Sequence, residues 1–347
     1  MYDLPPESIA QIGVEPRDAS RLMLAHADGH LSHRHFYDVI DCLNAGDVLV
    51  VNDTRVLPAR LLGVREGGGA AELLLLRRLE RDVWEALARP GRKLHPGARI
   101  IFGDGALVAT IQRETPERRA PEGGRIVSFA YEGAFEALLD RLGVMPLPPY
   151  ITQQLEDPNR YQTVYAREHG SAAAPTAGLH FTPELLARIA QKGITTAPIV
   201  LHVGLGTFRP VQAEDVSEHI MHEEWYSVSE ASAAAINAAR SVGGRIVCVG
   251  TTCVRTLESA ADDDGAVRAQ SGFTRIFITP GYRFKAVDAL ITNFHLPGST
   301  LLMLVSAFMG RHGAEPDAGR KKALAAYREA VAQGYRFYSL GDAMFIE

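Results

Sequence analysis

The sequence has few cysteines and no long apolar run. Its 347 residues include three cysteines, Cys42, Cys248 and Cys253, and no two of them form a Cys-x-x-Cys pair. This count argues against a disulfide framework and against a cysteine-based metal site. Apolar runs such as residues 301–305 are far shorter than the roughly 20 residues of a membrane helix. The opening residues MYDLPP do not form a basic and then apolar export signal. We therefore expect a cytoplasmic protein with no membrane segment.

The sequence also lacks the strong positive charge of many nucleic-acid-binding proteins, because its formal net charge is −5. The distribution is uneven, however. Residues 60–131 contain 13 Lys and Arg against 9 Asp and Glu. Such local asymmetry points to a basic module that faces a polyanion. Arginines scattered over a solvated surface explain it equally well.

Residues 60–131 are also distinct in pattern, with short β-type runs separated by glycine and proline. The spacing is typical of a small all-β sandwich or barrel. Its loop 89–97 (RPGRKLHPG) carries the cations Arg89, Arg92 and Lys93 on a backbone restricted by two prolines. A basic loop that is already restricted suits phosphate contacts, although a simple solvated turn has the same composition.

The rest of the chain alternates strands and helices, which predicts an α/β domain. Residues 48–51 (VLVV) form a buried strand, and Asp53 and Arg55 follow it directly. Polar residues at the carboxyl end of such a strand are placed to touch a ligand. Alternatively, these two cap a turn and pair with each other.

Four junctions before helices or after strands share small residues together with hydroxyl or imidazole groups. The first contains His180, just before the N-cap Thr182 and Pro183 of a predicted helix. The others are residues 204–209, residues 250–252 and residues 293–300. Because such junctions line one end of an α/β sheet, we expect them to form a single polar pocket.

Two groups of histidines raise the question of a metal. His26, His30, His33 and His35 lie in loop-like sequence without a carboxylate at a repeated interval, which favours ordinary surface histidines. The group of His219, His222 and Glu223 matches no zinc-hydrolase pattern. We expect no metal.

Several longer stretches resemble the S-adenosylmethionine:tRNA ribosyltransferase-isomerases of queuosine biosynthesis. The main ones are residues 174–181 (APTAGLHF), 201–208 (LHVGLGTF), 249–255 (VGTTCVR) and 292–297 (TNFHLP). Residues 145–150 (MPLPPY), 161–165 (YQTVY) and 341–344 (GDAM) also fit. The resemblance runs from Leu4 to the C-terminus.

The resemblance implies an α/β fold: a distorted α/β barrel-like main domain, residues 1–59 and 145–347, with an inserted all-β barrel domain, residues 60–144. It implies a transferase that moves the ribosyl part of S-adenosylmethionine, its co-substrate, onto the 7-aminomethyl-7-deazaguanine base at the tRNA wobble position. The product is epoxyqueuosine-tRNA, and adenine and methionine are released.

This chemistry needs a base for the proton next to the sulfonium and an acid for the departing adenine, and histidine suits both tasks. We expect His180 and His202 to supply the pair, with His295 in reserve. The residues expected to hold S-adenosylmethionine are Thr176, Gly178, Gly204, Gly206, Thr207, Gly250, Thr251 and Thr252. For tRNA we expect contacts from Arg89, Arg92 and Lys93. We expect the protein to be a monomer.

Two other classes of protein share part of this pattern. An S-adenosylmethionine-dependent tRNA methyltransferase would bind the same co-substrate but pass on its methyl group. A non-catalytic RNA-binding protein would need only the basic β module. Cys253 is interpreted as a small core residue, because nothing near it in sequence marks an activated thiolate.

Overall fold

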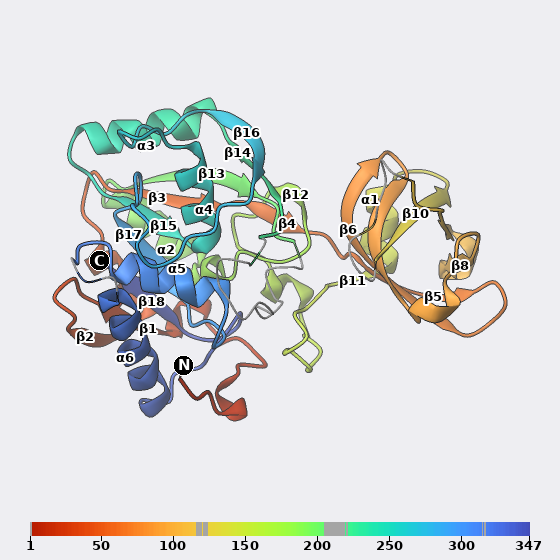
Figure 1. The fold of residues 1–347 in the computed structure, drawn as a ribbon, viewed down its shortest axis with the longest axis horizontal. Helices are drawn as coiled ribbons and strands as arrows, with labels where there is room; N and C mark the ends of the chain where they lie inside the picture. Colours follow the sequence, from red (N-terminus) through yellow and green to blue (C-terminus); the bar gives the residue numbers. More distant parts are fainter. Residues whose placement is uncertain are drawn as a thin grey trace. The chain divides into compact units, whose positions relative to one another are not determined.

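The computed structural model describes residues 2–115, 120, 124–204, 219, 221–313, 315 and 317–347. These residues form two compact units (Figure 1). The first unit contains Met1–Arg55, Pro149–Glu168 and Ala174–Glu347, and the second contains Val56–Pro148 and His169–Ala173. The second unit therefore encloses the segment 60–144 expected as an inserted domain, and it includes a short later segment that the sequence did not predict.

Strands and helices alternate in the first unit, whereas strands dominate the second. The strands are β1 (Arg21–Ala25), β2 (Leu31–His35), β3 (Val48–Asn52), β4 (Thr54–Val56), β5 (Arg60–Arg65), β6 (Ala70–Glu80), β7 (Val83–Arg89), β8 (Arg99–Phe102), β9 (Leu107–Ile111), β10 (Gly124–Tyr131), β11 (Gly143–Val144), β12 (Glu168–Ser171), β13 (Thr195–Leu201), β14 (Glu224–Val228), β15 (Ile246–Val249), β16 (Gln270–Thr274), β17 (Ala289–Asn293) and β18 (Ala343–Ile346). The α-helices are α1 (Phe135–Leu142), α2 (Pro183–Gln191), α3 (Glu230–Ser241), α4 (Thr251–Ala260), α5 (Thr300–Met309) and α6 (Ala318–Ala332). Short 3₁₀ helices include η3 (Phe36–Cys42), η4 (Gly91–Lys93) and η7 (Thr176–His180).

A nine-stranded mixed sheet organises the first unit, in the order β16-β14-β13-β3-β15-β17-β18-β1-β2. Its middle strands β13, β3, β15 and β17 are parallel to one another. All five residues of β3 are buried. A strand buried on both faces reads as a continuous apolar run, which explains why the sequence 48–51 has no polar alternation.

The helices bury apolar stripes against this sheet. Leu185 and Ile189 of α2 join a core cluster with Val51 of β3 and Val249 of β15. Thr182 caps α2 as predicted, because its Oγ1 accepts the N–H of Leu185 at 3.1 Å. Helix α4 packs against β13 and β15, and α5 packs against α6 (Figure 1). These contacts fix the helix ends that follow β15 and β17.

The second unit is a six-stranded antiparallel barrel with the short strand β11 added at β5. Its strands pair in the order β5-β6-β7-β10-β9-β8, and β8 pairs back with β5. Closure removes the open edges at which other chains could pair. Helix α1 packs on the barrel through Phe135, whose ring lies 5.6 Å from Trp84 and 5.1 Å from Phe129. The predicted α/β class with an inserted all-β barrel is confirmed.

Candidate active site

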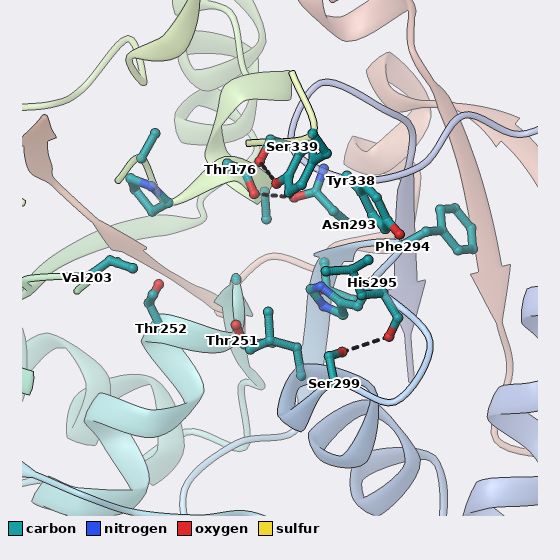
Figure 2. A pocket seen from close by; sticks show the side chains of 18 residues that line it. Thr176, Val203, Thr251, Thr252, Asn293, Phe294, His295, Ser299, Tyr338 and Ser339 are labelled. Atoms are coloured by element: carbon teal, nitrogen blue, oxygen red, sulfur yellow. Dashed lines mark hydrogen bonds between the residues drawn. The ribbon is translucent and has the colours of Figure 1, made fainter. Parts of the chain in front are cut away.

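The parallel strands β13, β3, β15 and β17 end at the same edge of the sheet, and a cavity lies there within the first unit (Figure 2). Small, hydroxyl and aromatic side chains share its wall. The lining residues are Tyr150, Ala174, Pro175, Thr176, Ala177, Val203, Gly250, Thr251, Thr252, Thr292, Asn293, Phe294, His295, Leu296, Ser299, Leu301, Tyr338 and Ser339.

Gly250 connects β15 to α4 and starts one side of the cavity. Its φ of +93° is a conformation that favours glycine. Helix α4 begins at Thr251, because Gly250 supplies the turn directly before it. Thr251 and Thr252 therefore lie in the first turn, where N–H groups and the helix dipole favour an anionic ligand group.

The η7 turn forms the opposite side and is tied to β17 by Asn293. The Thr176 hydroxyl donates to Asn293 Oδ1 at 2.9 Å, and Asn293 Nδ2 lies 3.1 Å from His180 Nε2. Because the amide oxygen of Asn293 faces Thr176, its NH₂ group faces His180. His180 Nε2 is then the acceptor, and the ring proton is on Nδ1, 2.7 Å from Ser20 Oγ.

His180 itself is buried and does not line the cavity. Its ring stacks on Phe36 with centroids 4.8 Å apart. Burial, helped by the charges of Arg160, Arg336 and Arg17, lowers its pKa to about 3. Both ring nitrogens are engaged in hydrogen bonds, so the neutral imidazole holds Asn293 in place.

His295 lines the cavity, unlike His180. Its Nε2 lies 2.8 Å from Thr292 Oγ1, and its backbone N–H donates to the Tyr327 hydroxyl at 3.1 Å. Burial lowers its pKa to about 3. At neutral pH the site therefore presents a neutral imidazole at this position.

His202 and Gly204 follow β13 and lie just outside the cavity lining, with Val203 between them. The His202 ring lies 4.9 Å from Trp225. Burial lowers its pKa, and the Glu168 carboxylate acts in the opposite direction. Gly204 donates its N–H to Glu224 Oε1 at 2.9 Å, and Glu224 forms a buried ion pair with Arg255.

The structure brings together five of the predicted site residues in the cavity wall: Thr176, Gly250, Thr251, Thr252 and His295. Gly178 is not among the lining residues. A Cβ at this position would collide with the Tyr165 hydroxyl. That glycine serves the packing of the turn. Gly206 and Thr207 lie outside the described residues.

Sequence reasoning missed an aromatic and hydroxyl wall formed by Tyr150, Tyr338 and Ser339. Tyr150 hydrogen-bonds Ser339 Oγ at 2.6 Å, and its ring lies 4.7 Å from that of Tyr338. Tyr338 has a φ of +71°, which is rare for a bulky residue and marks functional sites. Only the 145–150 and 341–344 stretches pointed to this region from the sequence.

The basic loop after β7 belongs to the second unit. Arg89, Arg92 and Lys93 are exposed. Arg125 holds the backbone of this loop, since its guanidinium donates to the carbonyl of Gly91 at 2.9 Å and to that of Leu94 at 2.9 Å. The loop thus presents its cations from a fixed backbone.

Two negative findings apply to the part of the chain that the structure describes. There, His, Cys, Asp and Glu side chains form no group of three that could hold a metal ion. None of the helices in those residues is long and apolar enough to cross a membrane.

Comparisons with known proteins place the chain in a family. A family model described as queuosine biosynthesis protein matches residues 1–346. An S-adenosylmethionine:tRNA ribosyltransferase-isomerase of Symbiobacterium thermophilum is 63% identical over 99% of this chain and 98% of its own length. One of Moorella thermoacetica is 62% identical with the same coverage.

A solved structure gives the same result. The crystal structure of S-adenosylmethionine tRNA ribosyltransferase from Thermotoga maritima is 39% identical, with a TM-score of 0.55, over 100% of this chain and 99% of that one. The resemblance seen in the sequence is therefore confirmed, and the chain belongs to the family of queuosine biosynthesis proteins.

Proposed function

We infer that the protein is an S-adenosylmethionine:tRNA ribosyltransferase-isomerase. It transfers and isomerises the ribosyl part of S-adenosylmethionine onto the 7-aminomethyl-7-deazaguanine base of tRNA, giving epoxyqueuosine-tRNA, adenine and methionine. The observation that carries this inference is the match to relatives of that name over almost the whole chain. No finding favours the methyltransferase alternative.

The chemistry of the cavity supports S-adenosylmethionine as the co-substrate. The first turn of α4, with Gly250, Thr251 and Thr252, suits a carboxylate or ribose hydroxyls. On another part of the wall, Tyr150 and Tyr338 offer aromatic surface, which suits a purine ring. Thr176 is already oriented by Asn293. We propose that these groups, with Gly204 beside them, hold the co-substrate.

The three histidines contribute in different ways in this proposal. His180 acts by orienting Asn293, because its own hydrogen bonds are already made. His295 faces the cavity as a neutral hydrogen-bonding group. His202 is our candidate for one member of the acid and base pair, because neither of its ring nitrogens has a hydrogen-bond partner among the described residues. The Glu168 carboxylate also opposes the lowering of its pKa by burial.

We also propose that tRNA contacts the exposed loop cations Arg89, Arg92 and Lys93. Because Arg125 already holds the loop backbone, less conformational entropy is lost when these cations contact phosphates. Since the proposed substrate is tRNA, we place the protein in the cytoplasm. We also propose a monomer, because one chain supplies all the described residues of the cavity wall.

A labelling experiment tests the reaction. The enzyme is incubated with tRNA that carries the precursor base and with S-adenosylmethionine labelled either in the ribose or in the methyl group. Ribose label in tRNA, together with free adenine, is the expected result. Methyl label in tRNA with release of adenosylhomocysteine would instead establish the methyltransferase.

A further inference from the structure

The loop after β17 carries His295 into the cavity wall, and both backbone polar groups of this residue are held by tyrosine hydroxyls. The His295 N–H donates to the Tyr327 hydroxyl at 3.1 Å, and the His295 carbonyl accepts a hydrogen bond from the Tyr2 hydroxyl at 2.5 Å. Backbone groups of surface loops are commonly left to water. Here two side chains from distant parts of the chain fix the backbone of one residue that lines the cavity.

Packing holds the two tyrosines themselves in place. Tyr327 is 0% and Tyr2 is 4% exposed, and their rings meet edge to face with centroids 5.1 Å apart. The Tyr327 ring also lies 5.4 Å from the ring of Phe294, the residue before His295. Because the rings are already ordered by these contacts, their hydroxyls lose little further freedom when they bind the loop.

The same loop is held at a third backbone position. The Phe294 carbonyl accepts the N–H of Tyr338 at 3.0 Å, and Tyr338 itself lines the cavity. Three hydrogen bonds therefore act on the carbonyl of Phe294 and on the N–H and carbonyl of His295. This part of the cavity wall is fixed by the closing segment, by α6 and by Tyr2.

The His295 ring has one nitrogen available to a ligand. Its Nε2 lies 2.8 Å from Thr292 Oγ1, and its Nδ1 has no hydrogen-bond partner among the described residues. Nδ1 is also not one of the buried polar atoms that lack a partner. Since His295 lines the cavity, Nδ1 is its open hydrogen-bonding position. A hydrogen bond weakens steeply with a poor angle, so the backbone position of His295 decides what this atom can reach.

We propose that Tyr327 and Tyr2 are positioning residues that fix His295 so that its Nδ1 meets a polar atom of bound S-adenosylmethionine, an inference that rests on the proposed function. Neither tyrosine lines the cavity, so both act through the backbone of His295. Removing either hydroxyl leaves a backbone group of His295 unpaired. The loop then shifts, and the hydrogen bond from Nδ1 to the co-substrate weakens.

Tyr335 provides a matched control in the same group of aromatic rings. It is 1% exposed, and its ring lies 5.4 Å from that of Phe294, the same separation as for Tyr327. Its hydroxyl lies 2.8 Å from His33 Nδ1. Y327F, Y2F and Y335F each remove one hydroxyl and keep the ring, but only Y327F and Y2F remove a contact with His295.

Transfer of ribose label to precursor tRNA is measured at saturating tRNA over a range of S-adenosylmethionine concentrations, and melting temperatures are measured in parallel. Y327F and Y2F should each raise the Michaelis constant for S-adenosylmethionine about 5-fold, because one hydrogen bond that holds the site is lost. Their Michaelis constant for tRNA should stay that of wild type. Y335F should lower the melting temperature about as much as Y327F and leave both Michaelis constants unchanged.

The split between KM and kcat separates positioning from stability. A purely structural role would reduce the amount of active enzyme, which lowers kcat and leaves KM unchanged. Active wild type together with Y327F and Y2F whose KM for S-adenosylmethionine matches that of Y335F would overturn the positioning role alone. A wild type that transfers no ribose label would instead overturn the proposed function.

Discussion

At the scale of single residues, hydrogen-bond partners decide what each histidine does. His180 is placed by Ser20 on one side and Asn293 on the other. The Asn293 amide in turn receives the Thr176 hydroxyl. One buried imidazole therefore sets the orientation of two residues that line the cavity. It does so in its neutral form, in which Nε2 accepts a hydrogen bond from Asn293.

This neutrality predicts how stability depends on pH. The native pKa of His180, about 3, lies below the ordinary value of 6.5. As the pH falls below 6.5, the unfolded chain therefore takes up a proton that the native protein does not, and stability is lost down to about pH 3. One such histidine contributes a slope of about 1.4 kcal/mol per pH unit.

Chemical denaturation of wild type and H180Q between pH 6.5 and 4.5 checks this expectation. The slope of the unfolding free energy against pH should be shallower for H180Q, by the contribution of about one proton. H30Q is the control, because His30 is exposed, and its slope should match wild type. Equal slopes for wild type and H180Q would show that His180 is not buried in its neutral form.

At the scale of elements, the start of α4 connects the sheet to the cavity. Gly250 has a φ of +93°, and a Cβ at this position would approach Thr252 Oγ1 at 3.4 Å and the Ala177 Cβ at 3.6 Å. These are ordinary contact distances, so it is the backbone conformation, and not a lack of space, that favours glycine. The position of the helix N-terminus, and of the N–H groups it offers, thus depends on this residue.

G250A should therefore affect both stability and binding. The strained backbone should cost about 1–3 kcal/mol of unfolding free energy, and the Michaelis constant for S-adenosylmethionine should rise, because the first turn of α4 shifts. G243A is the control: Gly243 has a φ of +78° with nothing within 4 Å of an added Cβ. It should lose similar stability without a change in the Michaelis constant. A normal Michaelis constant in G250A would show that the N-terminus of α4 does not contribute to co-substrate binding.

At the scale of the whole molecule, two compact units divide the work. The cavity wall comes entirely from the first unit. The basic loop comes from the second unit, whose closed barrel gives it a fixed base. The chain thus separates the proposed chemistry from the proposed electrostatic contact with tRNA.

The salt dependence of tRNA binding tests this division. Each phosphate contact contributes about 0.7–0.9 to the slope of log affinity against log salt. R92A/K93A should weaken tRNA binding and reduce this slope by the contribution of up to about two phosphate contacts. R320A/K321A removes the same charge from exposed positions of α6 that already pair with Asp317 and Glu315. This control should bind tRNA like wild type, and an unchanged slope in R92A/K93A would exclude the loop as a phosphate contact.

Local sequence determined much of the architecture. Glycine and proline punctuation located the barrel strands, because each strand is short and ends at a turn. The apolar run before Asp53 located β3. The prediction that four junctions form one pocket was correct for residues 250–252 and for the junction 293–300, because parallel strands must end at the same edge of a sheet. His180 lies outside that cavity, and residues 205–209 are outside the described part of the chain.

Only the tertiary structure decided which side chains face that pocket. His180 was expected to supply an acid or a base in the pocket, yet packing against Phe36 buries it and its hydrogen bonds turn it toward Asn293. Tyr338 and Ser339 enter the wall from the far end of the chain. The sequence by itself therefore determined the elements and the edge where the site lies, because these follow from local pattern and strand direction. Burial and proton positions depend on contacts between distant segments, which only the folded chain brings together.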